Sequence, residues 1–285
     1  MQQNGQLFIV PTPIGNLGDF SSRAIQTLQT VDLIAAEDTR HSQRLLHHFQ
    51  ISKPLISLHE HNESKHTHKI IALLQEGKSI ALLSDAGTPL ISDPGQTLVA
   101  QAHLAQIKVV PLPGPCAAIT ALSAAGFECT EFTFIGFLPA KSSQRLSKLK
   151  ALSSEFRTLI FYETPHRIVA TLEDMRTVLG DTRRVCFARE LTKFYETICV
   201  RTLGELTEWV QQNSTQQQGE YVLILEGKPE EKQISSVAEH ETLLGLLLTE
   251  LPIKKAVQLA TQLTGARKNA LYDLALSLTQ KKHTP

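Results

Sequence analysis

Short apolar runs that alternate with amphipathic segments over residues 7–112 are the feature that most constrains the fold of this chain. The apolar runs occupy residues 7–12, 32–37, 55–59, 79–84 and 108–112. The segments between them have helical periodicity and occupy residues 22–30, 41–50, 64–76 and 96–105, with Ser21 or Ser22 as the first cap. This alternation is typical of an α/β domain with a largely parallel sheet, in which ligands bind beyond the carboxyl ends of the strands.

The pattern changes after a predicted helix of small residues at 117–125. Strand-like runs then follow at residues 132–137, 158–162, 184–188, 197–201 and 221–225. Two predicted helices, residues 167–179 and 203–211, interrupt these runs. The last two runs have the character of a hairpin or an antiparallel pair, so the segment is predicted to be a second, mixed α/β domain.

A charged and polar segment, residues 228–234, is typical of a linker. Three predicted helices follow at 236–250, 253–263 and 267–278, and Gly265 separates the last two as in a helix-turn-helix. Residues 254–285 contain six lysines or arginines and one acid, Asp273. This local excess fits either a solvated helical face or an appendage that contacts RNA. The predicted domains are therefore 1–120, 121–230 and 231–285.

Composition excludes several classes of protein. A hydrophobic content of 42% with 20% charged residues is incompatible with a wholly disordered chain. The 28 basic and 28 acidic residues cancel, so nucleic-acid binding would need a local basic surface. The four cysteines form no C-x-x-C pair, which argues against a disulfide framework and a zinc site. The start of the chain has no basic segment followed by a long apolar one, so we expect a soluble cytoplasmic protein that does not bind membranes.

Four turns rich in proline, glycine or charge follow apolar runs and are the candidate ligand site. They are residues 11–19, 37–41, 84–95 and 111–118. The first turn lacks the G-x-G-x-x-G and G-K-[ST] patterns of nucleotide-binding loops, so alone it also fits a rigid connection. The second turn fits either an ion pair that caps the next helix or side chains that project into a cleft.

The third turn is the strongest candidate. Two prolines and two glycines among nine of its residues fix an unusual backbone path, and Asp93 is predicted to cap the following helix. Asp85 is suited to accept hydrogen bonds from a ribose or an amine. In the fourth turn, Cys116 has no neighbouring histidine to activate it, so it is not expected to be a nucleophile.

These motifs make the chain similar to the tetrapyrrole methylase superfamily of S-adenosylmethionine-dependent enzymes. The similar blocks are residues 10–19, 36–40, 84–95, 113–118, 134–139, 161–167, 188–193, 219–222 and 265–272. Within the superfamily the chain most resembles the branch that methylates the ribose 2′-hydroxyl of a cytidine in the decoding region of small-subunit rRNA. Thr12 and Pro13 depart from the glycine-rich first turn of the tetrapyrrole-modifying branch, which argues against a porphyrin-type substrate.

The resemblance implies two α/β domains with the cofactor in a cleft between them, a small C-terminal helical appendage, and a homodimer. It also implies which residues bind S-adenosylmethionine. They are Pro13, Asp85, Ala86, Gly87, Thr88, Leu90, Ile91, Cys116, Ala117, Tyr162, Leu191, Glu220 and Tyr221. The implied partner is small-subunit rRNA within the assembled small ribosomal subunit.

Methyl transfer to a ribose hydroxyl needs the acceptor oxygen in line with the methyl group, and a group that removes the proton. Candidate bases are Asp19, Asp38, His41, Glu60, Glu163 and Glu190. Candidate cations that would hold phosphate or lower the hydroxyl pKa are Arg40, Lys141, Arg167, Arg189 and Lys193. The predicted catalytic set is Asp38, Arg40, Glu163, Arg167 and Glu190, with no single base preferred.

RNA contacts are predicted from clusters of basic residues. The run 141–150 has four basic residues and no acid, which fits either an RNA contact or an ordinary basic helix face. The predicted RNA-binding residues are Lys141, Arg145, Lys148, Lys193, Arg267 and Lys268.

Three rival functions remain. Seven of the eleven histidines lie between positions 41 and 68, which makes a metal-dependent hydrolase the rival enzyme, but no H-E-x-x-H motif is present and no metal site is predicted. A non-catalytic RNA-binding protein would have no need of four ordered turns around a small-molecule cleft. A related methylase with a small-molecule substrate would not need the basic C-terminal helices.

Overall fold

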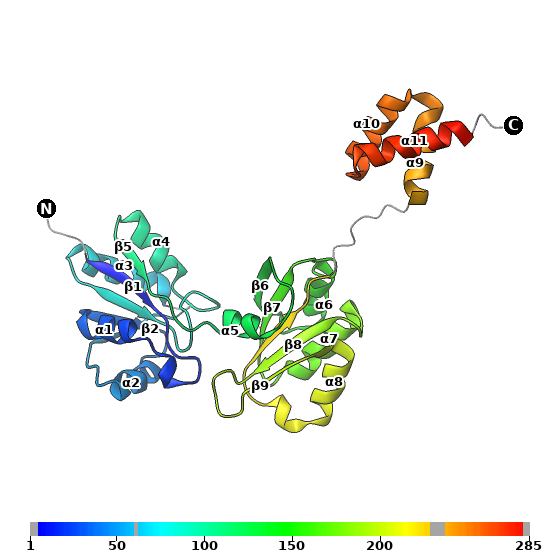
Figure 1. The fold of residues 1–285 in the computed structure, drawn as a ribbon. Helices are drawn as coiled ribbons and strands as arrows, with labels where there is room; N and C mark the ends of the chain where they lie inside the picture. The colour runs from blue at the N-terminus through cyan, green and yellow to red at the C-terminus, as the bar shows by residue number, and fades with distance from the viewer. Residues whose placement is uncertain (1–4, 60–61, 229–236, 282–285) are drawn as a thin grey trace. The chain divides into compact units, whose positions relative to one another are not determined.

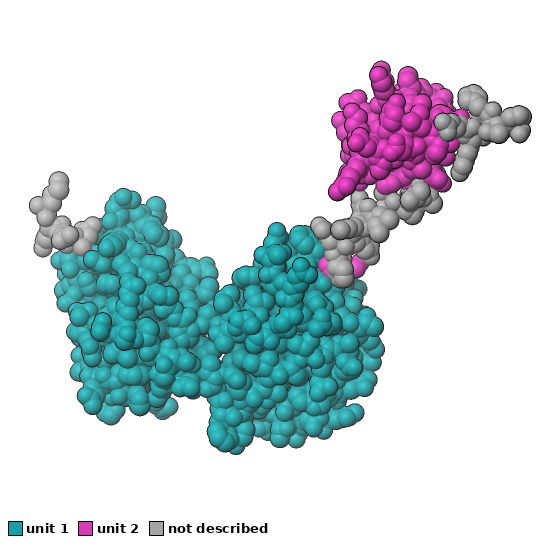
Figure 2. Space-filling model, in the orientation of Figure 1, with its two compact units in different colours: residues 1–227 teal, residues 228–285 magenta. Residues whose placement is uncertain are grey.

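The computed structural model of this chain describes residues 5–59, 62–228 and 237–281 (Figure 1). The chain divides into two compact units, residues 1–227 and 228–285, coloured separately in Figure 2. Division of the larger unit near residue 120 stays a prediction, although this unit contains two separate sheets.

The first sheet is entirely parallel, as the alternating pattern predicts. Its strands are β1 (Gln6–Val10), β2 (Leu33–Ala36), β3 (Leu55–Ser57), β4 (Ile80–Leu83) and β5 (Lys108–Pro111). Their order in the sheet is β3-β2-β4-β1-β5. The carboxyl ends of the strands therefore lie at one edge, which brings the turns after β1, β2, β4 and β5 to the same side.

Helices cover both faces of this sheet because buried strand residues alternate between them. The covering helices are α1 (Ser22–Thr30), α2 (Thr39–His48), α3 (Glu63–Gln75) and α4 (Gln96–Leu104), and a short 3-10 helix, η1 (Leu17–Asp19), follows β1. Ile34 of β2 packs in one core with Leu28 of α1, whereas its neighbour Ala35 packs in another core with Ile70 of α3. The first half of the larger unit is thus a three-layer sandwich.

The second sheet is mixed. After α5 (Ala117–Ala124) its strands are β6 (Phe132–Phe137), β7 (Thr158–Glu163), β8 (Arg184–Arg189), β9 (Thr197–Thr202) and β10 (Tyr221–Leu225), in the order β6-β7-β10-β8-β9. Only β6 and β7 are parallel neighbours. The predicted antiparallel character of the last two strands is confirmed, but they do not form a hairpin: β9 pairs with β8, while α8 (Leu203–Gln212) carries the chain back to insert β10 between β7 and β8.

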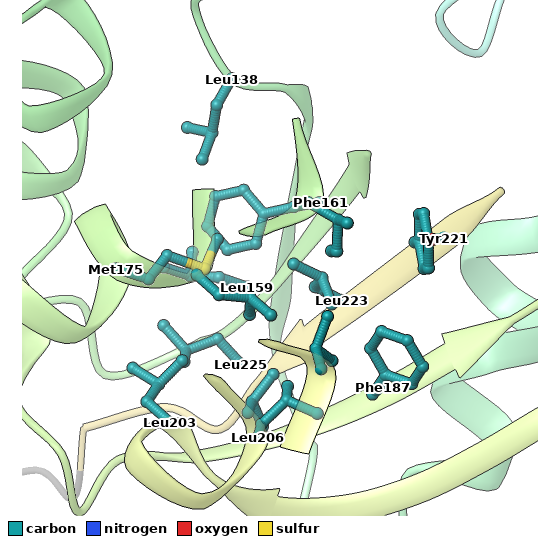
Figure 3. Packing of buried hydrophobic residues seen from close by; sticks show 14 of the residues in the cluster. Leu138, Leu159, Phe161, Met175, Phe187, Leu203, Leu206, Tyr221, Leu223 and Leu225 are labelled. Atoms are coloured by element: carbon teal, nitrogen blue, oxygen red, sulfur yellow. The ribbon is translucent and has the colours of Figure 1, made fainter. Parts of the chain in front are cut away.

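One face of the second sheet carries its main core, and the other face is covered by the small residues of α5. Helices α6 (Ser142–Ala151), α7 (Ile168–Leu179) and α8 pack on the main face, where Phe161, Leu223 and Met175 are buried (Figure 3). Helices α7 and α8 are predicted from the sequence among these strands, whereas α6 is not included among the predicted helices. Helix α6 is polar, and Leu149 is its only fully buried apolar residue, so its amphipathic signal is weak.

The C-terminal unit is a bundle of three helices, α9 (Val237–Glu250), α10 (Ile253–Thr264) and α11 (Lys268–Lys281), as predicted. Leu244, Val257 and Leu271, one from each helix, are buried together. Gly265 ends α10 with a φ of 69°, a left-handed conformation that glycine adopts without strain. Most of the predicted linker lies outside the described residues. None of the described helices has the length and apolarity that a membrane crossing requires.

Candidate active site

A cavity of about 330 Å³ in the larger unit receives side chains from both sheets. Its first-sheet wall consists of Ile14, Glu37, Asp85, Ala86, Gly87, Thr88, Ile91, Ser92 and Asp93. Cys116 and Ala117 lie at the start of α5, and the second-sheet wall consists of Phe137, Tyr162, Glu163, Thr164, Ala188, Leu191, Lys193, Glu220, Tyr221 and Val222. The volume is within the range of pockets that bind small molecules.

The turn that follows β4, residues 84–95, is bonded to the other three turns. Thr12 and Gly87 exchange two backbone hydrogen bonds of 2.9 and 3.0 Å, which join this turn to the first. The Asp38 amide donates to Asp85 Oδ1 at 3.1 Å, which joins it to the second. Thr88 Oγ1 donates to the Pro115 carbonyl at 2.8 Å, which joins it to the fourth. The four turns therefore form one structure.

Several residues of the turn 84–95 have backbone conformations that cost energy. Leu90 and Ser92 have φ angles of 73° and 68°, which only a surrounding framework maintains in residues other than glycine. Gly87 has a φ of 80°, and a Cβ at this position would come within 3.3 Å of Ile14 Cγ2. Glycine lets the backbone of this turn approach both the neighbouring turn and the cavity.

Three carboxyl groups line the first-sheet side of the cavity: Glu37, Asp85 and Asp93. Burial, together with the negative charges of Asp93 and Asp85, raises the pKa of Glu37 to about 7. Burial also raises the pKa of Asp93 to about 6, despite a hydrogen bond from Ser84. Each carboxylate destabilises its neighbours, and a cation in the cavity would relieve that repulsion. This wall is suited to a positively charged ligand.

Tyr162 connects the second sheet to the start of α5. Its hydroxyl oxygen accepts a hydrogen bond of 3.2 Å from the Ala118 amide, one of the free amides of the helix N-terminus. The ring makes edge contacts with Phe134 and Phe137, at centroid distances of 5.0 and 5.6 Å. Burial raises the pKa of the hydroxyl, so it stays neutral and fixes α5 beside the cavity.

Lys193 binds two carboxylates at the rim of the cavity. Its Nζ donates to Glu190 Oε1 at 2.9 Å and to Glu220 Oε2 at 2.8 Å. Glu190 Oε1 also accepts a bond of 2.9 Å from the Glu220 amide. Lys193 and Glu220 line the cavity, whereas Glu190, a predicted catalytic residue, lies behind them. Glu190 thus positions the rim.

Glu163 is a predicted catalytic residue whose carboxylate is fully engaged. Only 2% of the residue is exposed. Oε1 accepts the Thr164 amide at 2.8 Å and lies 3.2 Å from Arg167 Nε, while Oε2 accepts Thr171 Oγ1 at 2.7 Å. Arg167 also donates to the Leu138 carbonyl at 2.6 Å. These bonds fix the strand end that presents Tyr162, so we interpret Glu163 and Arg167 as positioning residues.

Asp38 and Arg40, also predicted to be catalytic, do not line the cavity. Asp38 caps α2 by accepting the Arg40 amide at 2.8 Å, as the capping interpretation of this turn expects. The Arg40 side chain is 91% exposed. Glu37, one position earlier, is the residue of this turn that enters the cavity.

Two of the thirteen predicted cofactor-binding residues, Pro13 and Leu90, do not line the cavity. Leu90 packs against the core of the first sheet, and Pro13 lines a neighbouring hollow. The predicted cap by Asp93 is wrong: Glu63 of α3 caps α4, because its Oε1 accepts the Thr97 amide at 2.8 Å. Candidate base Glu60 lies outside the described residues.

Arg145 differs most from its predicted role as an RNA contact. Only 3% of it is exposed, and its Nε donates to Asp174 Oδ2 at 2.7 Å. Its guanidinium has no free face for RNA, so we interpret the pair as structural. Lys141 and Lys148, and Arg267 and Lys268 in the C-terminal unit, are exposed. Their RNA contacts stay a prediction.

Several cavity residues are absent from the predicted site, among them the acids Glu37 and Asp93. Both lie in turns selected from the sequence, but which acid of a turn faces the cavity depends on contacts between distant parts of the chain. In the part of the chain that the structure describes, no three His, Cys, Asp or Glu side chains are grouped to hold a metal ion.

Two family models match the chain. Residues 6–207 match the model of Tetrapyrrole (Corrin/Porphyrin) Methylases. Residues 235–279 match the RsmI C-terminal HTH domain. Solved structures with the same fold include a uroporphyrin-III-C-methyltransferase from Thermus thermophilus, at 18% identity and a TM-score of 0.53, which covers 78% of this chain and 94% of that one. The methyltransferase CobJ has a TM-score of 0.57 at 18% identity, with the same coverage.

Closer relatives extend over nearly the whole chain. The ribosomal RNA small subunit methyltransferase I of Escherichia coli O157:H7 is 56% identical over 273 residues, which are 95% of each chain. The protein of the same name from Haemophilus influenzae is 52% identical and covers 97% of this chain and 98% of its own. The one from Pseudomonas aeruginosa is 55% identical and covers 95% and 97%. The chain therefore belongs to the tetrapyrrole methylase family and, within it, to the ribosomal RNA small subunit methyltransferase I family.

Proposed function

We propose that this chain transfers a methyl group from S-adenosylmethionine to the ribose 2′-hydroxyl of a cytidine in the decoding region of small-subunit rRNA. The names of relatives at 52% and 56% identity support an activity on this RNA. The observation that carries the proposal is the cavity itself. Four turns enclose it, and three carboxyl groups line one wall.

The residues present fit S-adenosylmethionine. The positive charges of its sulfonium and amino groups match Glu37, Asp85 and Asp93, whose mutual repulsion a cation would relieve. The open backbone of residues 86–88 and the start of α5 offer hydrogen-bonding groups to its polar parts. Ile14, Leu191 and Val222 supply apolar surface for the adenine ring.

When bound, that cofactor would supply an electrophilic methyl group, and the acceptor hydroxyl would need a base to take its proton. The base that we propose is Glu37, a cavity carboxyl whose pKa is raised to about 7 by burial and the neighbouring carboxylates when no cation is present. The bonded turns hold the wall rigid, which keeps the reacting groups aligned.

The test is label transfer from methyl-labelled S-adenosylmethionine to small ribosomal subunits from cells that lack this activity, followed by nucleoside analysis. We expect the label in 2′-O-methylcytidine. Asp85→Asn should weaken cofactor binding and transfer, whereas Glu76→Gln, a change of an exposed carboxylate outside the cavity, should leave both unchanged. Label in a base, or no transfer to subunits or free RNA by the folded protein, would overturn the substrate assignment.

We also propose that the enzyme is a cytoplasmic homodimer and that its substrate is the assembled subunit rather than free rRNA. The homodimer and the subunit substrate follow from the family resemblance. A parallel assay with the two substrates tests the second point, and sedimentation of the purified protein tests the first. Transfer to free rRNA at the same rate, or a monomer at micromolar concentration, would contradict them.

A further inference from the structure

A second hollow, of about 480 Å³, adjoins the cavity in the larger unit. The two share five lining residues, Ile14, Asp85, Ala86, Lys193 and Glu220, and meet along this common wall. The remaining lining residues of the second hollow are Pro13, Gly15, Leu17, His41, Arg44, Leu45 and His48. Apart from the shared residues and Pro13, which the resemblance assigns to the cofactor, no residue proposed to bind S-adenosylmethionine lines this space.

One stripe of α2 forms the outer side of the second hollow. His41, Arg44, Leu45 and His48 are spaced three and four residues apart, so they project from the same face of the helix. The two turns of helix between His41 and His48 thus lie along the hollow. Opposite them lies the first turn, residues 11–19.

The two hollows differ in charge. The first is lined by five carboxyl groups and one lysine, whereas the second has only two of those carboxyl groups, Asp85 and Glu220, with the same lysine, and adds an arginine and two histidines. Arg44 is exposed and has no hydrogen bond or ion pair to any described residue. Lys193, by contrast, is held by Glu190 and Glu220. Arg44 is therefore an unpaired cation that lines the second hollow, and a phosphate is the ligand that its planar guanidinium binds best.

The second hollow also offers apolar surface. Leu17 is 43% exposed, which leaves a leucine side chain open to solvent beside the hollow, and Leu45 is half-buried. A ribose or a base has apolar faces that would cover such side chains. Cationic and apolar groups together match a nucleotide better than they match a free inorganic anion.

We propose that the second hollow binds the acceptor nucleotide of the RNA, with a phosphate next to the target ribose on Arg44 and the hydroxyl at the common wall. This inference rests on the proposed function and deepens it. A hollow of about 480 Å³ admits one nucleotide but no duplex, so the target nucleotide must be unpaired when it binds.

The experiment compares Arg44→Ala and Arg44→Lys with Arg23→Ala, a change of an exposed arginine of α1 that lines neither hollow. Three quantities are measured: KM for unmethylated small subunits, Kd for those subunits at several salt concentrations, and Kd for S-adenosylmethionine by calorimetry. We expect Arg44→Ala to raise the KM and Kd for subunits about tenfold. It should lower the salt slope of log Kd by about one and leave the cofactor Kd within about twofold of wild type.

Arg44→Lys keeps the charge and should recover most of the salt slope but only part of the affinity. An Arg44→Ala enzyme with wild-type KM and salt slope, or one that loses cofactor affinity as strongly as subunit affinity, would overturn the inference. The activity of the wild-type enzyme distinguishes failure of the proposed function from failure of the acceptor site. If it transfers no methyl group to any RNA, the proposed function fails; if it does and Arg44→Ala behaves as Arg23→Ala does, only the acceptor site fails.

Discussion

Gly15 and Lys193 lie so close together that a Cβ on Gly15 would come within 2.5 Å of Lys193 Cγ. The same atom would meet Thr192 Oγ1 at 2.9 Å and the Leu191 carbonyl oxygen at 3.0 Å. The first turn of one sheet thus rests directly on the segment that follows β8 in the other. Since Lys193 borders both hollows, this contact sets the shape of their common wall.

Replacement of Gly15 by alanine should disturb that contact. The new methyl group meets backbone at Leu191 as well as side chains, so the segment after β8 must shift by several tenths of an ångström. We expect the affinities for S-adenosylmethionine and for the small subunit to fall together, each by about fivefold to tenfold, with the fold intact by circular dichroism. Gly18→Ala is the matched control, because a Cβ there meets only the Asn16 side chain, at 3.2 Å or more. Equal affinities for both variants and wild type would contradict the prediction.

Stability should respond to pH through Glu37. Its pKa rises from 4.5 in a free chain to about 7 in the fold, so the native state holds a proton that the unfolded state releases between those values. Its contribution to stability is present below about pH 4.5 and is lost as the pH rises through 7. In the absence of cofactor, the free energy of unfolding of Glu37→Gln should exceed that of wild type by about 1 kcal/mol at pH 8, a figure reduced for solvent screening. At pH 4.5 the two free energies should be equal. Urea unfolding at both pH values measures this, and a difference that grows toward acid pH would refute it.

Cofactor binding should release protons. A cation in the cavity favours the ionised forms of Glu37 and Asp93, whose pKa values of about 7 and 6 leave both partly protonated near pH 6.5. Calorimetry in two buffers of different ionisation enthalpy should detect the loss of about 0.5–1 proton per cofactor at that pH. Glu37→Gln should reduce this number, and binding without any proton exchange in wild type would count against a cation beside these carboxyls.

Arg145 should contribute to stability rather than to RNA binding. Its side chain and that of Asp174 are only 4% and 16% exposed, and removal of Arg145 leaves the Asp174 carboxylate with a hydrogen bond of 3.0 Å from Ser142 Oγ but no opposite charge. Arg145→Ala should therefore destabilise the protein by about 3 kcal/mol in denaturant unfolding. Lys148→Ala, on an exposed position of the same helix, should change stability by less than about 0.5 kcal/mol. A stable Arg145→Ala protein with weakened RNA affinity would reverse this interpretation.

The sequence predicts the first sheet well because each strand there is a local apolar run and parallel neighbours need helices between them. It does not predict that β10 lies in the middle of the second sheet, since strand order depends on contacts between distant parts of the chain. The local sequences of β9 and β10 are both typical of a strand, yet β10 is buried on both faces and β9 lies at an edge.

The candidate site shows the same limit at the scale of single residues. The turn after β2 is selected correctly as a site element, but of two adjacent acids only Glu37 enters the cavity while Asp38 caps a helix. Successive side chains at a strand end point in different directions, and no local pattern states which one faces the ligand. Arg145 likewise belongs to a basic run that is typical of a helix surface, and only its pairing with the distant Asp174 shows that it is buried.

The central place of β10 has a consequence for how the protein is made on the ribosome. The first sheet is complete when residue 111 has been synthesised, so this half can begin to fold while the chain is still growing. The second sheet must wait for residue 225, because until then β7 and β8 have no strand between them. Tyr221 and Val222, at the start of β10, therefore complete the cavity only when almost all of the larger unit has been translated.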